Sequence, residues 1–552
     1  MNVAENIRLS LSVALSKVGI TVEPHNVPLE HTDDFTHGDY ASGVALARVK
    51  EVSIAPRALA GKVRTALNEG HPMSFISKIE IAGPGFINFH LASAVFGKEI
   101  ETIVQNPDTW GRERQDVGRR IMVEYTDPNP FKEFHIGHLM SNAIGESIAR
   151  LLQFSGAEVY RANYQGDVGP HVAKAIWGKL QFPEKSWGGA YTAGAAAYEA
   201  NKAEIDLINQ KVYEKSDQEI NALYDAGRKE SLAHFEELYK ILGTKFDHYF
   251  FESETAPCGL KLVREHMDAF EESDGAIVYR GEREGLHTRV FITSQGLPTY
   301  EAKDLGLAQM KADTWPFDQS LTITAHEQSD YFEVVLAAMR KVLPDIAPKI
   351  QHASHGMMRF VEGKMSSRSG NVITGESLLD DVAEAARARA AESRAEDPEK
   401  LAQEIAVGAI KYQILKQASG KDIIFDRARA LSLDGDSGPY LQYTHARAHQ
   451  VVQRAASEGV APVVDPSVEP IELVRLMHRL PEIAARAAEA REPHFIANYL
   501  IAFAALFNRW YAQVHIVDGT AEAPHKVAIA DAARATLKQG LWLLGIPAPE
   551  KM

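Results

Sequence analysis

RIMVEYTDPNPFKEFHIGHL, residues 120–139, is the stretch that decides the fold. Its first seven residues, 120–126, are largely apolar and β-branched, which predicts a buried strand. Two prolines within 127–130 then prevent the strand from continuing and keep a helix from starting early. From Gly137 onward, apolar residues recur at helical spacing, which predicts a helix built on Leu139, Ala143, Ile144, Ile148, Leu151 and Leu152.

Two histidines, His135 and His138, lie with Lys132 at this predicted junction between strand and helix. Junctions of this kind in open α/β sheets bind phosphates, because helix N-terminal amides point outward and the helix dipole favours anions. Both histidines can donate to phosphate oxygens, and Gly137 lets a nucleotide approach the backbone closely. On its own, a histidine pair at this spacing is explained equally well by chance on a core helix.

A second segment, GKMSSRSGN at 363–371, is short, bracketed by glycines and rich in serine. Its two cations, Lys364 and Arg368, suit it to clamping a polyphosphate as negative charge develops. In isolation, an ordinary solvated loop is the simpler interpretation. Lys364 lies 226 residues after His138 (364 − 138), so the two segments meet only if two halves of one sheet fold together.

Together, the two segments resemble the paired signatures of class I aminoacyl-tRNA synthetases, H-I-G-H and K-M-S-K-S. In the second, Ser367 stands where the second lysine usually lies and Arg368 follows, a form found in arginyl-tRNA synthetases. Met140 and Val168 depart from the arginine and tryptophan common in that family. Further motifs of the family occur in order along the chain: His37–Ala41, Gly83–Phe89, Pro128–His135, Asn163–Asp167, Gly438–Arg447 and Ala548–Met552.

The chain, with 552 residues, is too long for a single core. The resemblance implies an α/β fold, in which a Rossmann-like parallel-sheet catalytic domain follows an N-terminal α/β module and precedes a C-terminal all-α helical bundle. We expect the tRNA-binding N-terminal module at 1–105 and the catalytic domain at 119–385, with a helical insertion at about 172–290. The anticodon-binding helical domain is expected at 400–552.

Composition limits the compartment and the partners. The single cysteine, Cys258, excludes internal disulfides and multi-cysteine zinc sites, which fits a reducing cytoplasm. The N-terminal stretch lacks the apolar core of a secretory signal, and no run reaches the 18 to 20 apolar residues that a membrane span requires. The net charge of −15 argues against uniform coating by nucleic acid, but local basic patches still allow tRNA binding.

The resemblance implies an arginine–tRNA ligase, which activates L-arginine with ATP and transfers it to the terminal ribose of arginine tRNA. Such catalysis is mainly positioning and stabilisation of developing charge. His135, His138, Lys132 and Lys364 are the expected catalytic residues. ATP would be accompanied by Mg²⁺, without a dedicated metal site in the protein. The resemblance implies that the nucleotide is bound by His135, Gly137, His138, Lys364, Met365, Ser366, Arg368, His326 and Gln328.

The arginine side chain requires carboxylates that meet its planar guanidinium group. Tyr300 and Asp304 are four residues apart and share a helix face. The resemblance implies that they bind arginine together with Glu252 and Asn129. Without the resemblance, a capped helix start and a surface charge are the simpler interpretations of these residues.

Residues 86–91 are predicted to form a strand, and the resemblance implies that its Phe86 and Asn88 read an unstacked nucleotide of tRNA. Without the resemblance, a core strand is the simpler interpretation. Aromatic and polar residues near the C-terminus are candidates for anticodon contact, although aromatics at helical spacing are more often core residues: Tyr443, Asn508, Tyr511 and Met552. The family usually acts as a monomer and requires tRNA for amino-acid activation.

Two other functions are compatible with parts of the pattern. A small-molecule nucleotidyltransferase could share the H-x-G-H sheet, but it has little need of two additional modules. A non-catalytic tRNA-binding paralogue should have lost some of the site, whereas the chain retains His135, His138, Lys364, Tyr300, Asp304 and Glu252.

Overall fold

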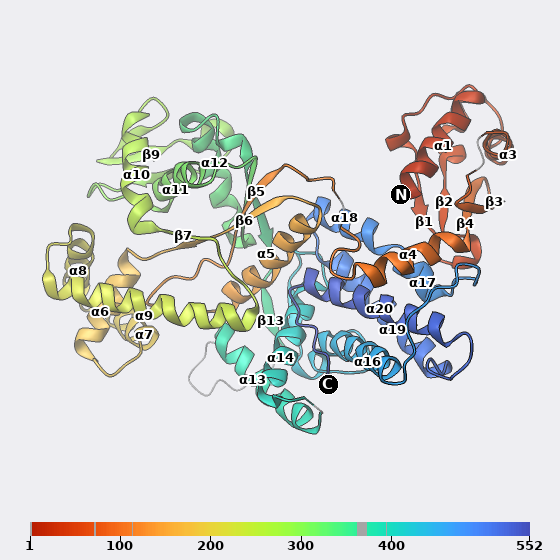
Figure 1. Cartoon of the computed structure of the whole chain (residues 1–552). Helices are drawn as coiled ribbons and strands as arrows, with labels where there is room; N and C mark the ends of the chain where they lie inside the picture. The colour runs from red at the N-terminus through yellow and green to blue at the C-terminus, as the bar shows by residue number, and fades with distance from the viewer. Residues whose placement is uncertain (1–2, 71–72, 113, 362–372, 394) are drawn as a thin grey trace. The chain divides into compact units, whose positions relative to one another are not determined.

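The computed structural model describes residues 3–70, 73–112, 114–361, 373–393 and 395–552 (Figure 1). The chain divides into two compact units. The first combines Met1–Trp110 with Ala448–Leu480 and Phe503–Thr536, and the second combines Gly111–Arg447 with Pro481–Ala502 and Leu537–Met552. Both units are therefore assembled from segments distant in sequence.

The N-terminal part of the first unit contains a four-stranded antiparallel sheet in the order β1-β2-β4-β3. The strand expected near Phe86 is confirmed as β4, in which Ile87, Phe89 and Leu91 are buried. The elements of this part are α1 (Val3–Lys17), β1 (Glu30–His31), β2 (Tyr40–Ser42), α2 (Val44–Val52), α3 (Pro56–Asn68), β3 (Ile76–Ala82), β4 (Phe86–Leu91) and α4 (Ser93–Gln105).

The second unit is built on a five-stranded parallel sheet in the order β12-β11-β5-β6-β7. Its strands are β5 (Arg120–Glu124), β6 (Glu158–Gln165), β7 (His248–Phe251), β11 (Gln319–Ala325) and β12 (Ile350–His355). The chain adds β6 and β7 on one side of β5 and later β11 and β12 on the other. The carboxyl ends of β5 and β11 therefore flank a topological switch point, where open α/β sheets bind ligands.

The helix predicted after the signature is confirmed as α5, which begins at Ile136. Helices connect the sheet strands: α5 (Ile136–Phe154), α6 (Pro170–Gln181), α7 (Trp187–Ala197), α8 (Lys202–Glu214), α9 (Gln218–Leu242), α10 (Glu252–Glu265), α11 (Tyr300–Thr314) and α12 (Ser329–Val342). A small antiparallel sheet of β8 (Glu271–Ser273), β9 (Ala276–Tyr279) and β10 (Arg289–Ile292) lies between α10 and α11 in sequence.

The segment expected as a helical insertion, 172–290, is helical through α9, but it also contains β7 of the central sheet. The run His248–Phe251, HYFF, is aromatic-rich, a composition that suits a strand. Its place in the sheet depends on pairing with Ala162–Gln165 of β6, which local periodicity does not reveal.

The part expected to be all-α, 400–552, contains one short strand, β14, which pairs with β13, and every regular element of the described chain beyond Phe425 is a helix. None of the helices within the described ranges carries an apolar stretch long enough to cross a bilayer. The remaining elements are β13 (Met358–Phe360), α13 (Gly375–Glu392), α14 (Pro398–Leu415), β14 (Ile423–Phe425), α15 (Arg427–Ala430), α16 (Gly438–Ser457), α17 (Glu472–Met477), α18 (Leu480–Ala490), α19 (His494–Gln513) and α20 (Ala523–Leu543).

Two glycines allow α10 and α11 to cross closely. A Cβ atom on Gly259 would clash with the carbonyl oxygen of Ala302, and one on Gly306 with that of Thr255. Both separations would fall below 3.0 Å, which real Cβ atoms essentially never show, and both obstacles are backbone atoms. The two helices pack antiparallel at this crossing, and Glu252 of α10 and Tyr300 and Asp304 of α11 line one cavity.

We predict that Gly306→Ala destabilises the second unit by about 1–3 kcal/mol, because the added methyl group forces the two helices apart. Thermal unfolding followed by circular dichroism measures the change. The control is Gly61→Ala in α3, where a Cβ atom meets nothing within 4 Å. That substitution should leave stability unchanged or raise it by up to about 1 kcal/mol. Equal effects of the two substitutions would contradict the close crossing.

Candidate active site

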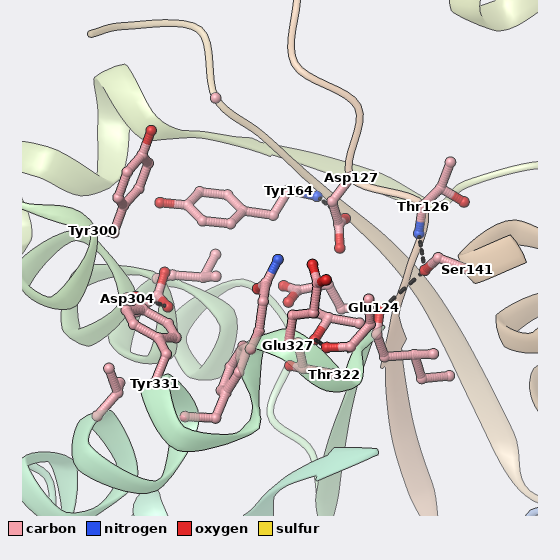
Figure 2. A pocket seen from close by; sticks show the side chains of 18 of the residues that line it. Glu124, Thr126, Asp127, Ser141, Tyr164, Tyr300, Asp304, Thr322, Glu327 and Tyr331 are labelled. Atoms are coloured by element: carbon pink, nitrogen blue, oxygen red, sulfur yellow. Dashed lines mark hydrogen bonds between the residues drawn. The ribbon is translucent and has the colours of Figure 1, made fainter. Parts of the chain in front are cut away.

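A cavity of about 560 Å³ lies at the carboxyl ends of β5, β6 and β11. Its wall contains Glu124 at the end of β5, Tyr164 near the end of β6 and Thr324 near the end of β11, together with the start of α5. Figure 2 shows Asp127, Glu124 and Glu327 gathered on one side of it and Asp304 with Tyr331 and Tyr300 on the other. This is the position expected for a ligand of a sheet with this strand order.

The backbone between β5 and α5 is strained. Thr126, Asp127 and Phe131 have φ angles of 80°, 47° and 70°. The β-branched Thr126 is especially disfavoured there, so such a conformation persists only where the surroundings impose it. The strand predicted at 120–126 therefore ends two residues early, at Glu124.

Serine hydroxyls hold this strained turn in place. The Ser141 hydroxyl accepts a hydrogen bond from the Thr126 N–H at 2.9 Å and donates to the Ile323 carbonyl at 3.0 Å (Figure 2). The Ser231 hydroxyl accepts from the Phe131 N–H at 2.9 Å. The loop is thereby tied to α5, β11 and α9, and it directs Asp127 and Asn129 into the cavity.

The two signature histidines form the N-terminal cap of α5. The His138 N–H donates to Nδ1 of His135 at 3.3 Å, and the His135 N–H donates to Nδ1 of His138 at 3.2 Å. The rings are stacked with 3.4 Å between their centroids. Because both Nδ1 atoms accept, the proton of each neutral ring is on Nε2. Burial lowers the pKa of His135 and lowers that of His138 further, so both rings are neutral near pH 7.

Carboxylates lie on both sides of the cavity, where Glu124 is buried and Asp127 and Asp304 are half-buried. Burial raises the pKa of Asp304 to about 7, although the Tyr331 hydroxyl donates to this carboxylate at 2.7 Å. Burial and the negative charge of Glu124 raise the pKa of Asp127 well above its usual value. Glu124 itself forms an ion pair with Lys311 at 2.6 Å. A cavity with several carboxylates favours a cationic ligand, which removes their mutual repulsion.

Glu252 and Asn129 converge on Gly166. A Cβ atom on Gly166 would clash with Oδ1 of Asn129 and lie 2.8 Å from Oε1 of Glu252. Glycine at this position therefore leaves room for the two acceptor oxygens. The other carboxylate oxygen of Glu252 pairs with the ammonium group of Lys303 at 2.6 Å. This partner holds the pKa of Lys303 above its usual value despite burial, so the lysine stays charged.

Most of the described residues that the sequence predicts for ATP and arginine line the cavity. They are Asn129, His135, Gly137, His138, Glu252, Tyr300, Asp304 and Gln328. Lys132 and His326 are not among the lining residues: the Lys132 ammonium lies 5.1 Å from the centroid of the Tyr191 ring, and Nδ1 of His326 lies 3.3 Å from the His355 carbonyl oxygen.

The second signature falls outside the described residues, including Lys364, Met365, Ser366 and Arg368. The chain that follows it is placed beside the histidines. Thr374 forms an antiparallel bridge with His135, and the Gly375 N–H donates to the Phe134 carbonyl at 2.8 Å. The described end of this segment is therefore anchored at the start of α5.

Sequence reasoning missed several residues of the cavity wall, including Glu124, Asp127, Tyr164, Lys311 and Tyr331. Asp127 carried a usable signal, since an acidic residue directly after a buried strand lies at the ligand-binding edge of a parallel sheet. Glu124 was concealed within an otherwise apolar strand. Lys311 and Tyr331 carried no local signal, because only the packing of α11 and α12 brings them to the cavity.

The residues predicted to read a tRNA nucleotide lie on β4. The Phe86 ring is exposed, whereas Asn88 is buried. Among the described residues, Oδ1 of Asn88 has no hydrogen-bond partner. This oxygen is inaccessible to solvent, so only the Phe86 ring is exposed for a base to stack on.

The predicted anticodon residues are distributed over the two units. In the second unit, the guanidinium group of Arg447 lies 4.5 Å from the centroid of the Tyr443 ring, and Met552 is half-buried. In the first, Asn508 is half-buried and Tyr511 is exposed, with its ring stacked on Phe507 at 6.3 Å between centroids.

Residues 99–427 match the family model described as tRNA synthetases class I (R), catalytic domain. The chain belongs to the class I arginyl-tRNA synthetase family. Two further models match its flanks, Arginyl tRNA synthetase N terminal domain over residues 5–91 and DALR anticodon binding domain over residues 441–552. This membership confirms the predicted enzyme class and function, an aminoacyl-tRNA synthetase that acts as an arginine–tRNA ligase.

Relatives of this synthetase match it over nearly their whole length. It is 29% identical over 566 residues to the arginine–tRNA ligase of Treponema pallidum subsp. pallidum, covering 96% of each chain. It is 29% identical over 579 residues to that of Clostridium perfringens, covering 100% of this chain and 99% of the relative. The solved structure of Thermus thermophilus arginyl-tRNA synthetase matches with a TM-score of 0.81 at 24% identity, over 99% of this chain and 100% of that one, which supports the fold.

We predict that His138→Ala in this synthetase lowers the rate of arginine activation roughly 10²–10³-fold, because it removes an Nε2–H donor at the helix start. Adenylate formation measured by single-turnover kinetics, together with an unfolding curve, separates catalysis from folding. The control is His234→Ala on α9, an exposed histidine whose loss should leave the rate unchanged. Turnover of the His138 variant near that of the unmodified enzyme would contradict the prediction.

The raised pKa of Asp304 predicts pH-dependent arginine affinity. A guanidinium group needs the ionised carboxylate, and a pKa of about 7 leaves Asp304 mostly protonated at pH 6 and mostly ionised at pH 8. Affinity should therefore rise about tenfold from pH 6 to pH 8, in titrations with arginine. Tyr331→Phe removes a hydrogen bond that lowers this pKa, so it should move the profile to higher pH. A flat profile in the unmodified enzyme would rule out Asp304 as the titrating group.

Proposed function

We propose that the cavity at the carboxyl ends of β5, β6 and β11 activates L-arginine with ATP, and that the aminoacyl group then passes to the terminal ribose of arginine tRNA. One juxtaposition carries the proposal. Two neutral histidine donors at a helix start share a cavity with carboxylates that need a cation. A triphosphate and a guanidinium group have the complementary charges.

The nucleotide end of the proposed site begins at the start of α5. The Nε2–H groups of His135 and His138 would donate to phosphate oxygens, and Gly137 leaves the backbone accessible. Gln328 on the cavity wall would bind the nucleoside. The second signature, with Lys364, Met365, Ser366 and Arg368, would neutralise the triphosphate and the departing pyrophosphate. Lys132 and His326 would contribute only if they turned towards the cavity.

Mg²⁺ is part of the proposal because ATP chemistry favours it. The described residues contain no group of three or more His, Cys, Asp or Glu side chains arranged to hold a metal ion. The Glu327 carboxylate on the cavity wall would offer one oxygen ligand, and the phosphates of ATP would supply others. This sharing fits Mg²⁺, which usually binds through one or two carboxylates and substrate phosphates.

The amino-acid end lies around α10 and α11. Asp304 would meet the guanidinium group, and the exposed Tyr300 on the cavity wall would cover it. Glu252 and Asn129, converging on Gly166, would accept from the remaining N–H groups of the substrate. A bound guanidinium group would lower the pKa of Asp304 and complete its ionisation.

The tRNA is proposed to contact β4 through Phe86 and Asn88 and the C-terminal helices through Tyr443, Asn508, Tyr511 and Met552. The exposed aromatic ring of Phe86 supports the first contact. We also propose that the enzyme acts as a monomer in the cytoplasm. The single half-buried thiol of Cys258, whose pKa burial raises, is suited to a reducing compartment.

The decisive test is charging of total tRNA with each amino acid in turn. Arginine alone should be attached. Asp304→Asn should weaken arginine binding at least tenfold while ATP binding persists, because it removes the charge that meets the guanidinium group. Asp313→Asn on the exposed side of the same helix is the matched control and should have no effect. Equal behaviour of the two variants would place the arginine pocket elsewhere.

We also expect exchange of pyrophosphate into ATP to be weak or absent until arginine tRNA is added. The family resemblance implies this requirement. In this chain the second cation of the loop stands one position later than usual, at Arg368, so the free enzyme would stabilise the triphosphate less well. Binding of tRNA and formation of the competent site would then favour each other. Exchange is measured with and without tRNA oxidised at its terminal ribose, and full exchange without tRNA would refute the coupling.

A further inference from the structure

A second cavity, of about 460 Å³, lies at the opposite end of the central sheet, where its strands begin. Arg119 and Lys349 immediately precede β5 and β12, and Arg491 follows α18. The three cations and the amide side chains of Gln319 and Gln351 line this cavity. All these residues belong to the second unit, and none lines the cavity of the proposed active site.

The two arginines are connected through a pair of glutamines. Arg119 donates to the Gln319 side-chain oxygen at 3.1 Å, and the Gln319 amide donates to the Gln351 side-chain oxygen at 2.9 Å. Arg491 donates to the same Gln351 oxygen at 2.7 Å. The guanidinium groups of Arg119 and Arg491 are thereby held close enough for their charges to interact. Burial and the positive charge of Arg119 lower the pKa of Arg491, because both disfavour a second positive charge there.

The carboxylates of the cavity neutralise only one of these cations, Arg119. Asp116 pairs with Arg119 at 2.6 Å and also accepts from Ser155, and Asp318 accepts from the Arg120 N–H at 2.8 Å. Glu489 is exposed to solvent. Within the described chain, neither Arg491 nor Lys349 has a carboxylate within ion-pair distance. Arg491 and Lys349 are therefore the lining cations that lack a carboxylate partner in the described chain, within a lining that has three cations and three carboxylates in all.

The backbone of Arg491 provides a second, independent observation. Its φ angle is 58°, at the position after α18 where helices commonly end with glycine. The Arg491 N–H bonds the Ala488 carbonyl and the Glu492 N–H bonds the Ala487 carbonyl, which completes the helix end. Glycine would adopt this conformation without strain. Arg491 therefore adopts this conformation at a cost that glycine would not have.

We propose that this cavity binds a small polyvalent oxyanion of the phosphate class through Arg119, Lys349 and Arg491. Guanidinium groups bind such anions with paired hydrogen bonds, and the anion removes the repulsion between the arginines. None of the described lining residues is aromatic, so the cavity offers no stacking surface for a nucleobase. Its place at the amino ends of the strands, away from the substrate cavity, favours a free anion such as phosphate or pyrophosphate over the phosphodiester of a bound tRNA. The inference is independent of the proposed function.

Arg491→Gly is the most informative variant, because it removes the side chain and relieves the backbone strain together. Lys215→Gly is the matched control. Lys215 is an exposed cation at the end of α8 with a φ angle of 51°, so this substitution makes the same changes remote from the cavity. His138→Ala is included because the active site also binds phosphates. Lys349→Gln tests the third cation without altering the backbone.

Titration calorimetry and thermal unfolding of the full-length chain with inorganic phosphate, and then with pyrophosphate, are the measurements. We expect binding that persists in His138→Ala and Lys215→Gly, weakens at least tenfold in Arg491→Gly and weakens severalfold in Lys349→Gln. Without anion, Arg491→Gly should unfold at the same or a higher temperature than the unmodified protein.

Three results would overturn the proposal. Unchanged anion binding in Arg491→Gly would show that the anion does not bind in this cavity. Equal loss of thermal stability with and without phosphate in that variant would show that Arg491 only stabilises the fold through its hydrogen bond to Gln351. Weaker binding of tRNA in Arg491→Gly, with binding of free phosphate unchanged, would show that the cavity takes an RNA phosphodiester. Charging activity is scored separately, so a failure of this proposal is distinguishable from a failure of the ligase assignment.

Discussion

The strained turn after β5 is the constraint on which the rest of the proposed active site depends. Thr126, Asp127 and Phe131 adopt left-handed backbone conformations, and the hydroxyls of Ser141 and Ser231 satisfy the N–H groups of the turn. The turn ends the central strand and aims the following loop at the carboxyl edge of the sheet. The helix then begins with a reciprocal cap of two histidines, which leaves each ring one donor for a ligand.

Burial has opposite consequences at the two ends of this cavity. It keeps the histidines neutral, so they donate hydrogen bonds without attracting a counter-charge. It also makes unpaired carboxylates unfavourable, and two buried lysines, Lys303 and Lys311, compensate only Glu252 and Glu124. Asp304 has no such lysine partner in the described chain, so its pKa stays raised until a cation binds. In the proposed site, selectivity for a guanidinium group would follow from this unpaired carboxylate.

The parallel sheet presents different chemistry at its two ends. Its carboxyl edge gathers residues from β5, β6 and β11 around the substrate cavity, whereas its amino edge gathers three cations around a second cavity. The glycine crossing of α10 and α11 serves the first, because it brings Glu252 and Asp304 to the same cavity wall. The length of the strands therefore separates the proposed anion site from the proposed active site.

The sequence alone determined the strand, turn and helix around residues 120–154, the strand Phe86–Leu91 and the family, because these depend on local periodicity and on contiguous motifs. It also identified Asn129, His135, His138, Glu252, Tyr300 and Asp304, all of which line the cavity. The tertiary structure alone decided that β5 ends at Glu124, that β7 joins the central sheet, and that Lys303 neutralises Glu252 from 51 residues away. Only the tertiary structure brought Lys311 and Tyr331 to the cavity wall. Pairing and burial between segments distant in sequence set these features. A local sequence pattern does not indicate which distant side chain will be buried beside a given residue.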